Sequence, residues 1–239
     1  MKRLPHRYVV AGCKSWHRRV FDDVLSKLAG DWHYVGEKEQ LSLARIRELR
    51  PRYAFFLHWS WKVPAEILEE TECICFHMTD VPYGRGGSPL QNLIVRSHRD
   101  TKLTALRMTS ELDAGPVYLK RDLSLEGGAE EIYLRACALS AEMIQQIVRD
   151  EVQPSPQAGE PVSFRRRKPE ESQITKLDSL EQLHDFIRML DAEDYPRAFL
   201  SYAGYRFEFS RSALYEGRVV ADVRITVDRK KPKTKEPKE

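Results

Sequence analysis

Residues 8–28, YVVAGCKSWHRRVFDDVLSKL, decide the fold class, because a strand, a turn and a helix follow one another there. The apolar run from Tyr8 to Ala11 is typical of a buried strand. Gly12 to Ser15 predicts a turn. The helix predicted from Trp16 to Leu28 carries its apolar side chains at helical spacing, at Val20, Val24, Leu25 and Leu28. One β-α unit therefore opens the chain.

The same alternation continues through the next 120 or so residues, which is typical of an α/β sheet with helices on its faces. Further strands are predicted at Trp32–Val35, Tyr53–Leu57, Cys73–Phe76, Leu103–Met108 and Val117–Leu123. Further helices are predicted at Leu41–Leu49, Ala65–Glu70, Pro89–Arg96 and Ala129–Arg149. We expect a mostly parallel sheet, closed by the last of these helices.

The C-terminal third has a different composition and predicts a smaller α+β appendage. Residues 153–175 are rich in Pro, Gln, Gly and Arg, which is typical of a strap or a linker. A helix is predicted at Leu180–Leu190, and a hairpin from Tyr205–Phe209 and Val219–Val227. We expect a main domain at residues 1–174, a subdomain at 175–228 and a disordered charged tail at 229–239.

Composition and charge favour a small-molecule partner. Of the 239 residues 41% are hydrophobic, and the formal charge of +3 is a small difference between 39 basic and 36 acidic residues. This balance gives no warrant for binding nucleic acid or a membrane surface. The N-terminal apolar run is too short for a signal peptide, so we expect a cytoplasmic protein whose four cysteines are reduced.

Two segments carry the chemistry. The first is CFHMTDVPYGRGGSPLQNLI at residues 75–94, and the second is LDAGP at residues 112–116. Together they resemble the formyltransferase family, which has an Asn-x-His at the end of a strand, a following turn rich in Gly and Arg, and a later Leu-Asp-x-Gly. The matching residues are His77, Pro82, Arg85, Gly86, Pro89, Leu112, Asp113 and Gly115.

The resemblance implies a Rossmann-like sheet, 10-formyltetrahydrofolate as the one-carbon donor, and an amine as acceptor. Attack of an amine on the formyl carbon creates an oxyanion and leaves a proton to be removed. His77, at the carboxyl end of a strand, is the candidate donor to the oxyanion. Asp113 is the candidate that orients the imidazole and accepts the amine proton, directly or through water.

Cys75 occupies the position of the family's Asn, and this departure affects the oxyanion site. A thiol is a weak hydrogen-bond donor and does not replace an amide. Thr79 or Asn92 is expected to supply the missing donor. A nucleophilic role for Cys75 is the alternative, although the sequence shows no basic partner that would activate it.

The folate pocket is placed by the resemblance at the exit of the Tyr53–Leu57 strand and around the loop at 108–113. It implies contacts from Phe56, Leu57, His58, Trp59, Pro64, Arg85, Gly86, Met108, Glu111 and Leu112. Aromatic side chains there suit a pterin ring, and backbone groups of the loop suit its polar edge. No metal site is expected, because Cys73 and Cys75 have no second pair at zinc spacing.

The sequence of the first motif is similar to that of formyltransferases of surface-sugar biosynthesis, and this resemblance implies a nucleotide-linked amino sugar as acceptor. About 55 residues follow the main domain before the tail, too few for a typical RNA-binding barrel, so tRNA is not expected. The aromatics Tyr202, Tyr205 and Phe207 would serve a sugar pocket or a homodimer surface. The alternative functions are a non-catalytic homologue that binds folate or a nucleotide, and a hydrolase of the formyl donor.

Overall fold

The computed structural model describes residues 6–228, and the chain divides into two compact units. The first comprises Met1–Gly127 and Glu131–Arg166, and the second comprises Gly128–Glu130 and Arg167–Glu239. The boundary falls inside the strap, whereas the sequence placed it after Ile174. The tail expected at residues 229–239 lies outside the described residues.

A six-stranded sheet in the order β2-β1-β3-β4-β6-β7 forms the centre of the first unit. β1 pairs with β2 and with β3 in parallel, as does β3 with β4, while β4 with β6 and β6 with β7 are antiparallel. The expected fold class is therefore confirmed, with an antiparallel extension at one edge. The strands are β1 (Arg7–Gly12), β2 (Asp31–Val35), β3 (Tyr53–Leu57), β4 (Cys73–His77), β6 (Asp100–Arg107) and β7 (Val117–Ser124).

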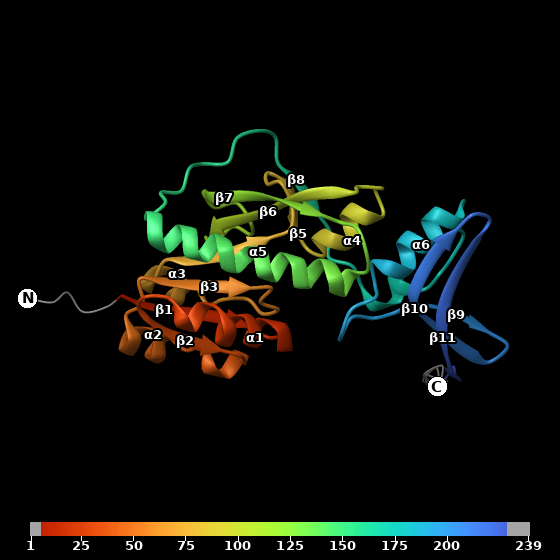
Figure 1. Ribbon diagram of the computed structural model, residues 1–239, viewed down its shortest axis with the longest axis horizontal. Helices are drawn as coiled ribbons and strands as arrows, with labels where there is room; N and C mark the ends of the chain where they lie inside the picture. Colours follow the sequence, from red (N-terminus) through yellow and green to blue (C-terminus); the bar gives the residue numbers. More distant parts are fainter. Residues whose placement is uncertain (1–5, 229–239) are drawn as a thin grey trace, which may run out of the picture. The chain divides into compact units, whose positions relative to one another are not determined.

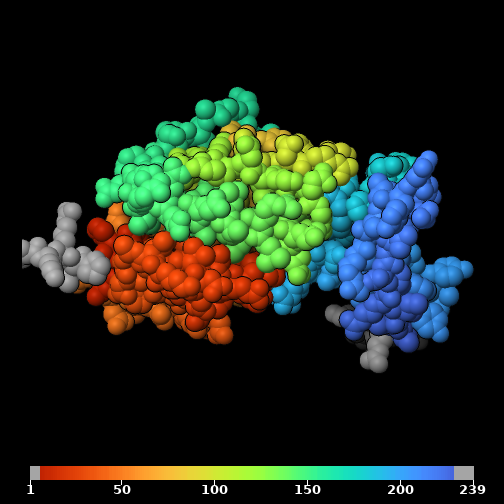
Figure 2. Space-filling view, in the orientation of Figure 1, coloured from red at the N-terminus to blue at the C-terminus, as the bar shows by residue number. Residues whose placement is uncertain are grey.

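Helices cover both faces of this sheet. They are α1 (Ser15–Asp23), α2 (Leu43–Leu49), α3 (Ala65–Glu70), α4 (Pro89–Ile94) and α5 (Ala129–Asp150). On one face Ile46 of α2 and Ile67 of α3 pack in a buried cluster with strand residues that include Phe56 and Cys73. Across the other face runs α5 (Figure 1), where the side chains of α5 and of the α1 segment meet over the sheet (Figure 2).

The helix expected from Trp16 to Leu28 is shorter in the structure. It ends at Asp23, and a three-residue 3-10 turn, Leu25–Lys27, follows it. Leu25, the first residue of this turn, has none of its surface exposed. Periodicity alone does not reveal this break, because the apolar spacing suits either kind of helix.

A two-stranded parallel sheet was not expected from the sequence. It pairs β5 (Tyr83–Gly86) with β8 (Val162–Phe164), and it joins the glycine-rich turn to the strap. Gly84 and Gly86 have φ values of 80° and 105°. A Cβ on Gly86 would lie 2.5 Å from the carbonyl oxygen of Phe164. Glycine permits this strand, although glycine is a poor predictor of strands.

The second unit contains a three-stranded antiparallel sheet in the order β11-β10-β9. Its elements are a short 3-10 helix (Pro169–Ser172), α6 (Leu180–Arg188), β9 (Ala198–Tyr202), β10 (Tyr205–Tyr215) and β11 (Arg218–Val227). The expected hairpin corresponds to β10 and β11, while β9 was missed. Ala203 and Gly204, both with positive φ, form the two-residue turn before β10.

Within residues 6–228 no helix is long and apolar enough to cross a membrane. The same residues contain no group of three or more His, Cys, Asp or Glu side chains arranged to hold a metal ion.

Candidate active site

His77 is the last residue of β4, at the carboxyl edge of the sheet, where open α/β folds bind their ligands. Its side chain is 9% exposed. The ring Nε2 lies 2.8 Å from the carbonyl oxygen of Gly84. Because a carbonyl oxygen only accepts hydrogen bonds, Nε2 is the protonated nitrogen in this contact. The other nitrogen, Nδ1, lies 3.6 Å from Asp113 Oδ2.

Asp113 is held beside His77 by backbone contacts on both sides of its loop. The backbone N–H of Gly86 donates to Asp113 Oδ2 at 2.9 Å. Asp113 has a φ of 53°, a left-handed conformation that is uncommon outside glycine. Two residues on, a Cβ at Gly115 would lie 1.8 Å from the carbonyl oxygen of Arg107. Only glycine fits there, so the loop closes tightly against the end of β6.

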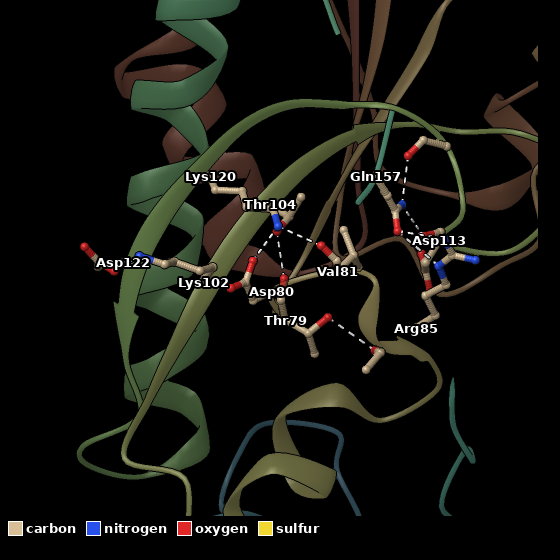
Figure 3. Close-up of polar contacts among 12 residues, drawn as sticks. Thr79, Asp80, Val81, Arg85, Lys102, Thr104, Asp113, Lys120, Asp122 and Gln157 are labelled. Atoms are coloured by element: carbon tan, nitrogen blue, oxygen red, sulfur yellow. Dashed lines mark hydrogen bonds and ion pairs between the residues drawn. The ribbon is translucent and has the colours of Figure 1, made fainter. Parts of the chain in front are cut away.

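Gln157 connects this loop to the glycine-rich strand. Its amide nitrogen donates to the carbonyl oxygens of Asp113 and Gly115, each at 2.8 Å. Arg85 in turn donates from Nε and Nη2 to the Gln157 amide oxygen, at 3.1 and 2.8 Å. Figure 3 shows Arg85 and Gln157 beside Asp113. Gln157 lies within the strap predicted at residues 153–175, and no local sequence pattern tells which loop a strap residue reaches.

Thr79 and Asn92, the candidate oxyanion donors, both bond to backbone carbonyls. The hydroxyl of Thr79 donates to the Gly84 carbonyl at 3.3 Å, the same oxygen that His77 contacts. The amide nitrogen of Asn92 lies 3.0 Å from the carbonyl oxygens of Gly87, Ser88 and Arg165. Either side chain would have to give up such bonds to reach a reacting oxygen.

Cys75 lies two residues before His77 on β4, so the two side chains share a face of the sheet. The thiol packs half-buried against the cluster that contains Phe56. Burial, reinforced by the nearby Asp113 carboxylate, raises the pKa of the Cys75 thiol far above its usual range. The thiol therefore stays protonated at neutral pH, which disfavours a nucleophilic role.

An apolar and aromatic wall adjoins Cys75 on the same face. Phe56 is buried there, with Trp59 and Met108 packed against the same cluster. The ring centroids of Trp59 and Trp61 are 4.8 Å apart, and Trp61 is 39% exposed. The buried Nε1 of Trp59 has no hydrogen-bond partner among the described residues. An unpaired buried donor beside an apolar wall fits a ligand with a ring and polar edges.

Other residues expected at the folate pocket do not join the wall formed by Phe56, Trp59 and Met108. Leu57 is buried on the opposite face of the sheet from Phe56. The ring of His58 packs edge-on against Tyr133 of α5, at 4.7 Å between centroids. Pro64 is an exposed residue at the N-terminus of α3. Glu111 is exposed and pairs with Arg85 at 3.4 Å, and Leu112 is 69% exposed. The structure thus groups Phe56, Trp59 and Met108 but not Leu57 or His58.

A cavity of about 400 Å³ at the carboxyl ends of β1 and β2 was not anticipated. Its lining includes three cationic side chains, Lys14, Arg18 and Arg45, together with Tyr34 and the backbone of Gly12. Arg18 pairs with Asp22 and stacks over the Tyr34 ring. Lys14 and Arg18 lie four residues apart at the start of α1, while Arg45 lies in α2, so no sequence motif marks the three cations as one site.

Comparison with known proteins agrees with this geometry. Residues 169–226 match the family model "Methionyl-tRNA formyltransferase, C-terminal domain". A solved structure named methionyl-tRNA formyltransferase from Clostridium thermocellum is 42% identical, with a TM-score of 0.88, over 93% of this chain and 99% of that one. A sugar N-formyltransferase from a Shewanella species shares the fold at 16% identity and a TM-score of 0.65, over 88% of this chain and 98% of that one.

Among curated proteins, a methionyl-tRNA formyltransferase from Thermodesulfovibrio yellowstonii is 24% identical over 75% of this chain and 60% of its own length. A second curated relative, from Rickettsia massiliae, is matched over 48% of its length. The chain thus spans about half the length of the curated relatives it matches. On the strength of the 42% identical structure, the chain belongs to the formyltransferase family, which confirms the resemblance.

The raised pKa of Cys75 gives a direct chemical prediction. At pH 8 the native protein should be alkylated by iodoacetamide at Cys75 at least about a hundredfold more slowly than the guanidinium-unfolded chain, because only the thiolate reacts. Peptide mass spectrometry after timed quenching measures the rate. Alkylation of native Cys75 as fast as in the unfolded chain would contradict the assignment.

Proposed function

We propose that this chain transfers the formyl group of 10-formyltetrahydrofolate to the primary amine of a small acceptor, an amino sugar linked to a nucleotide. The observation that carries the proposal is the buried pair of His77 and Asp113 at the sheet edge, 3.6 Å apart, beside an apolar wall. Membership of the formyltransferase family supports the reaction type.

The apolar wall supports folate as the donor. Phe56, Trp59 and Met108 offer a surface on which a pterin ring would lie, and the unpaired Trp59 Nε1 would donate to one of its polar edge atoms. Leu112 exposes 69% of its surface in the loop that carries Asp113, and a bound donor would cover it. This arrangement brings the formyl group toward His77.

His77 Nδ1 and Asp113 would manage the proton of the reaction. The bond from Nε2 to Gly84 leaves Nδ1 to receive the proton that the attacking amine loses as its nitrogen bonds to the formyl carbon. The Asp113 carboxylate stabilises the imidazolium that results. The same proton then passes to N10 of the folate as the bond from N10 to the formyl carbon breaks. Cys75 fills space beside the pair without taking part.

Two charge distributions support a nucleotide-linked small molecule as acceptor. Lys14, Arg18 and Arg45 line the cavity at the ends of β1 and β2, and cations at such a place suit phosphate groups. Residues 167–239 carry fifteen Lys and Arg against fourteen Asp and Glu, a nearly neutral balance that gives little electrostatic attraction to the RNA backbone.

Methionyl-tRNA is the second candidate acceptor. It is favoured by the name of the 42% identical solved structure and by the family model over residues 169–226. The chemistry at His77 and Asp113 would be the same for both acceptors, because each presents a primary amine.

One assay separates these functions. The purified protein is incubated with 10-formyltetrahydrofolate alone, with nucleotide-linked amino sugars, and with methionyl-tRNA, while release of tetrahydrofolate is followed. We expect rapid release only with an amino sugar. Release at the same rate without acceptor would identify a hydrolase. Release only with methionyl-tRNA would identify the second acceptor, and no release in any arm would contradict formyl transfer.

The His77 and Asp113 pair is tested by substitution. His77→Ala and Asp113→Asn should each lower kcat by at least about a hundredfold, the scale of losing an acid-base group, while the protein stays folded. Asp113→Asn keeps an oxygen for the Gly86 N–H, so it removes charge with little change in shape. Circular dichroism melting controls for folding. Near-normal kcat in either variant would remove the mechanism.

Substitution of Cys75 distinguishes a space-filling thiol from a nucleophile. Cys75→Ala should keep most activity, within about tenfold of the wild-type kcat, because the protonated thiol takes no part in bond formation. Cys75→Asn places a stronger donor on the same face as His77 and should be equal or faster. An inactive but folded Cys75→Ala protein would instead indicate a covalent thioester intermediate.

A further inference from the structure

β11 forms an open edge of the three-stranded sheet in the second unit. It is ten residues long, and only Val219 and Ala221 are half-buried, while the others are exposed. A long edge strand presents a row of unpaired backbone N–H and C=O groups, and natural proteins normally protect such an edge. Here the strand is rich in valine, with no proline within it.

One face of this sheet is apolar and open to solvent. Directly paired residues share a face, so Val227, Tyr205 and Tyr202 form one row across the three strands, and Ile225, Phe207 and Leu200 form the next. The exposed fractions are 67% for Val227, 58% for Ile225 and 73% for Tyr202. An apolar face that continues to an open edge is typical of a protein interface.

The sequence of β11 is complementary to itself when it is reversed about Val223. In an antiparallel pair of two copies centred there, Asp222 of one copy lies opposite Arg224 of the other, and Arg218 lies opposite Asp228. On the other face Val219 lies opposite Val227, Ala221 opposite Ile225, and Val223 opposite itself. Opposite charges and apolar pairs at directly facing positions both stabilise a sheet.

Neighbouring registers lose this match. A centre at Asp222 places Asp222 opposite itself, and a centre at Arg224 places Arg224 opposite itself. A centre midway between two residues would set the apolar face of one strand beside the polar face of the other. A centre at Ala221 places Arg218 opposite Arg224, and a centre at Ile225 places Asp222 opposite Asp228. Like charges at facing positions are unfavourable, so among these registers only the one centred on Val223 satisfies both faces.

We propose that two copies of this chain associate through β11, in antiparallel register centred on Val223, to form one continuous six-stranded sheet. The association is isologous, because each β11 contacts the same strand of the other copy. It pairs the open β11 edge of each copy and continues the apolar face across the two-fold axis. The proposal does not depend on the reaction that the first unit performs.

Engineered disulfides test the register. Facing residues in an antiparallel pair have Cα atoms about 4.5–5.5 Å apart, which suits a disulfide. Val223→Cys should therefore give a covalent dimer on mild oxidation of the full-length protein, seen on a non-reducing gel. Ala221→Cys, the matched control on the same face, should not link to itself. Ala221→Cys combined with Ile225→Cys should link. Links through Ala221→Cys alone, or none through Val223→Cys, would overturn the register.

Charge exchange tests the association itself. Arg218 and Asp228 form no ion pair within the described part of the chain, so reversing them leaves the monomer's ion pairs intact. We expect light scattering to give twice the 27.8 kDa chain mass for the wild type. Arg218→Asp and Asp228→Arg alone should each weaken dimerisation at least about tenfold, and the double variant should restore it.

Lys27→Asp, a reversal of an exposed charge in the first unit, is the control and should remain dimeric. A wild-type protein that stays monomeric at tens of micromolar would overturn the proposal. So would a double variant no better than the single ones.

Discussion

Close backbone packing around the carbonyl of Gly84 and the backbone N–H of Gly86 holds the candidate site together. The Gly84 carbonyl fixes the ring of His77, and the Gly86 N–H fixes the carboxylate of Asp113. Both positions need glycine, because their φ values are positive and their neighbours leave no room for a side chain. The small β5–β8 sheet therefore holds the side chains of His77 and Asp113, which come from distant segments, at a defined separation.

Polar groups around the site are mostly satisfied by the protein itself. The amides of Asn92 and Gln157 and the hydroxyl of Thr79 all bond to backbone carbonyls, so they shape the site more directly than they face a substrate. Two groups differ from these. Trp59 Nε1 is a buried donor without a partner among the described residues, and Leu112 is an exposed apolar side chain. Both features are explained if a ligand covers them.

The sequence predicted the parts of the fold that follow from local periodicity. β3 and α3 lie at their expected bounds, and the alternation of strands and helices led directly to the central sheet. It did not predict β5, whose glycines are poor strand formers, or β9, which is a short strand beside a turn. The pairing of Gln157 with the Asp113 loop also escaped it, because that contact joins residues 44 positions apart. Motifs identified His77 and Asp113. The face of the sheet on which Leu57 and His58 lie depends on how the strands pair, which the motifs do not show.

The central claim is that the loop carrying Asp113, held by the Gly86 N–H and by Gln157, sets the carboxylate beside His77 for proton transfer. Its most direct test is the steady-state kinetics of Gln157→Leu, which keeps the size of the side chain and removes its hydrogen bonds. Misplacing a catalytic group lowers the rate of the chemical step, so we expect kcat to fall at least about tenfold with KM for the acceptor changed less than about threefold. An unchanged kcat, in a protein of normal melting temperature, would contradict the account.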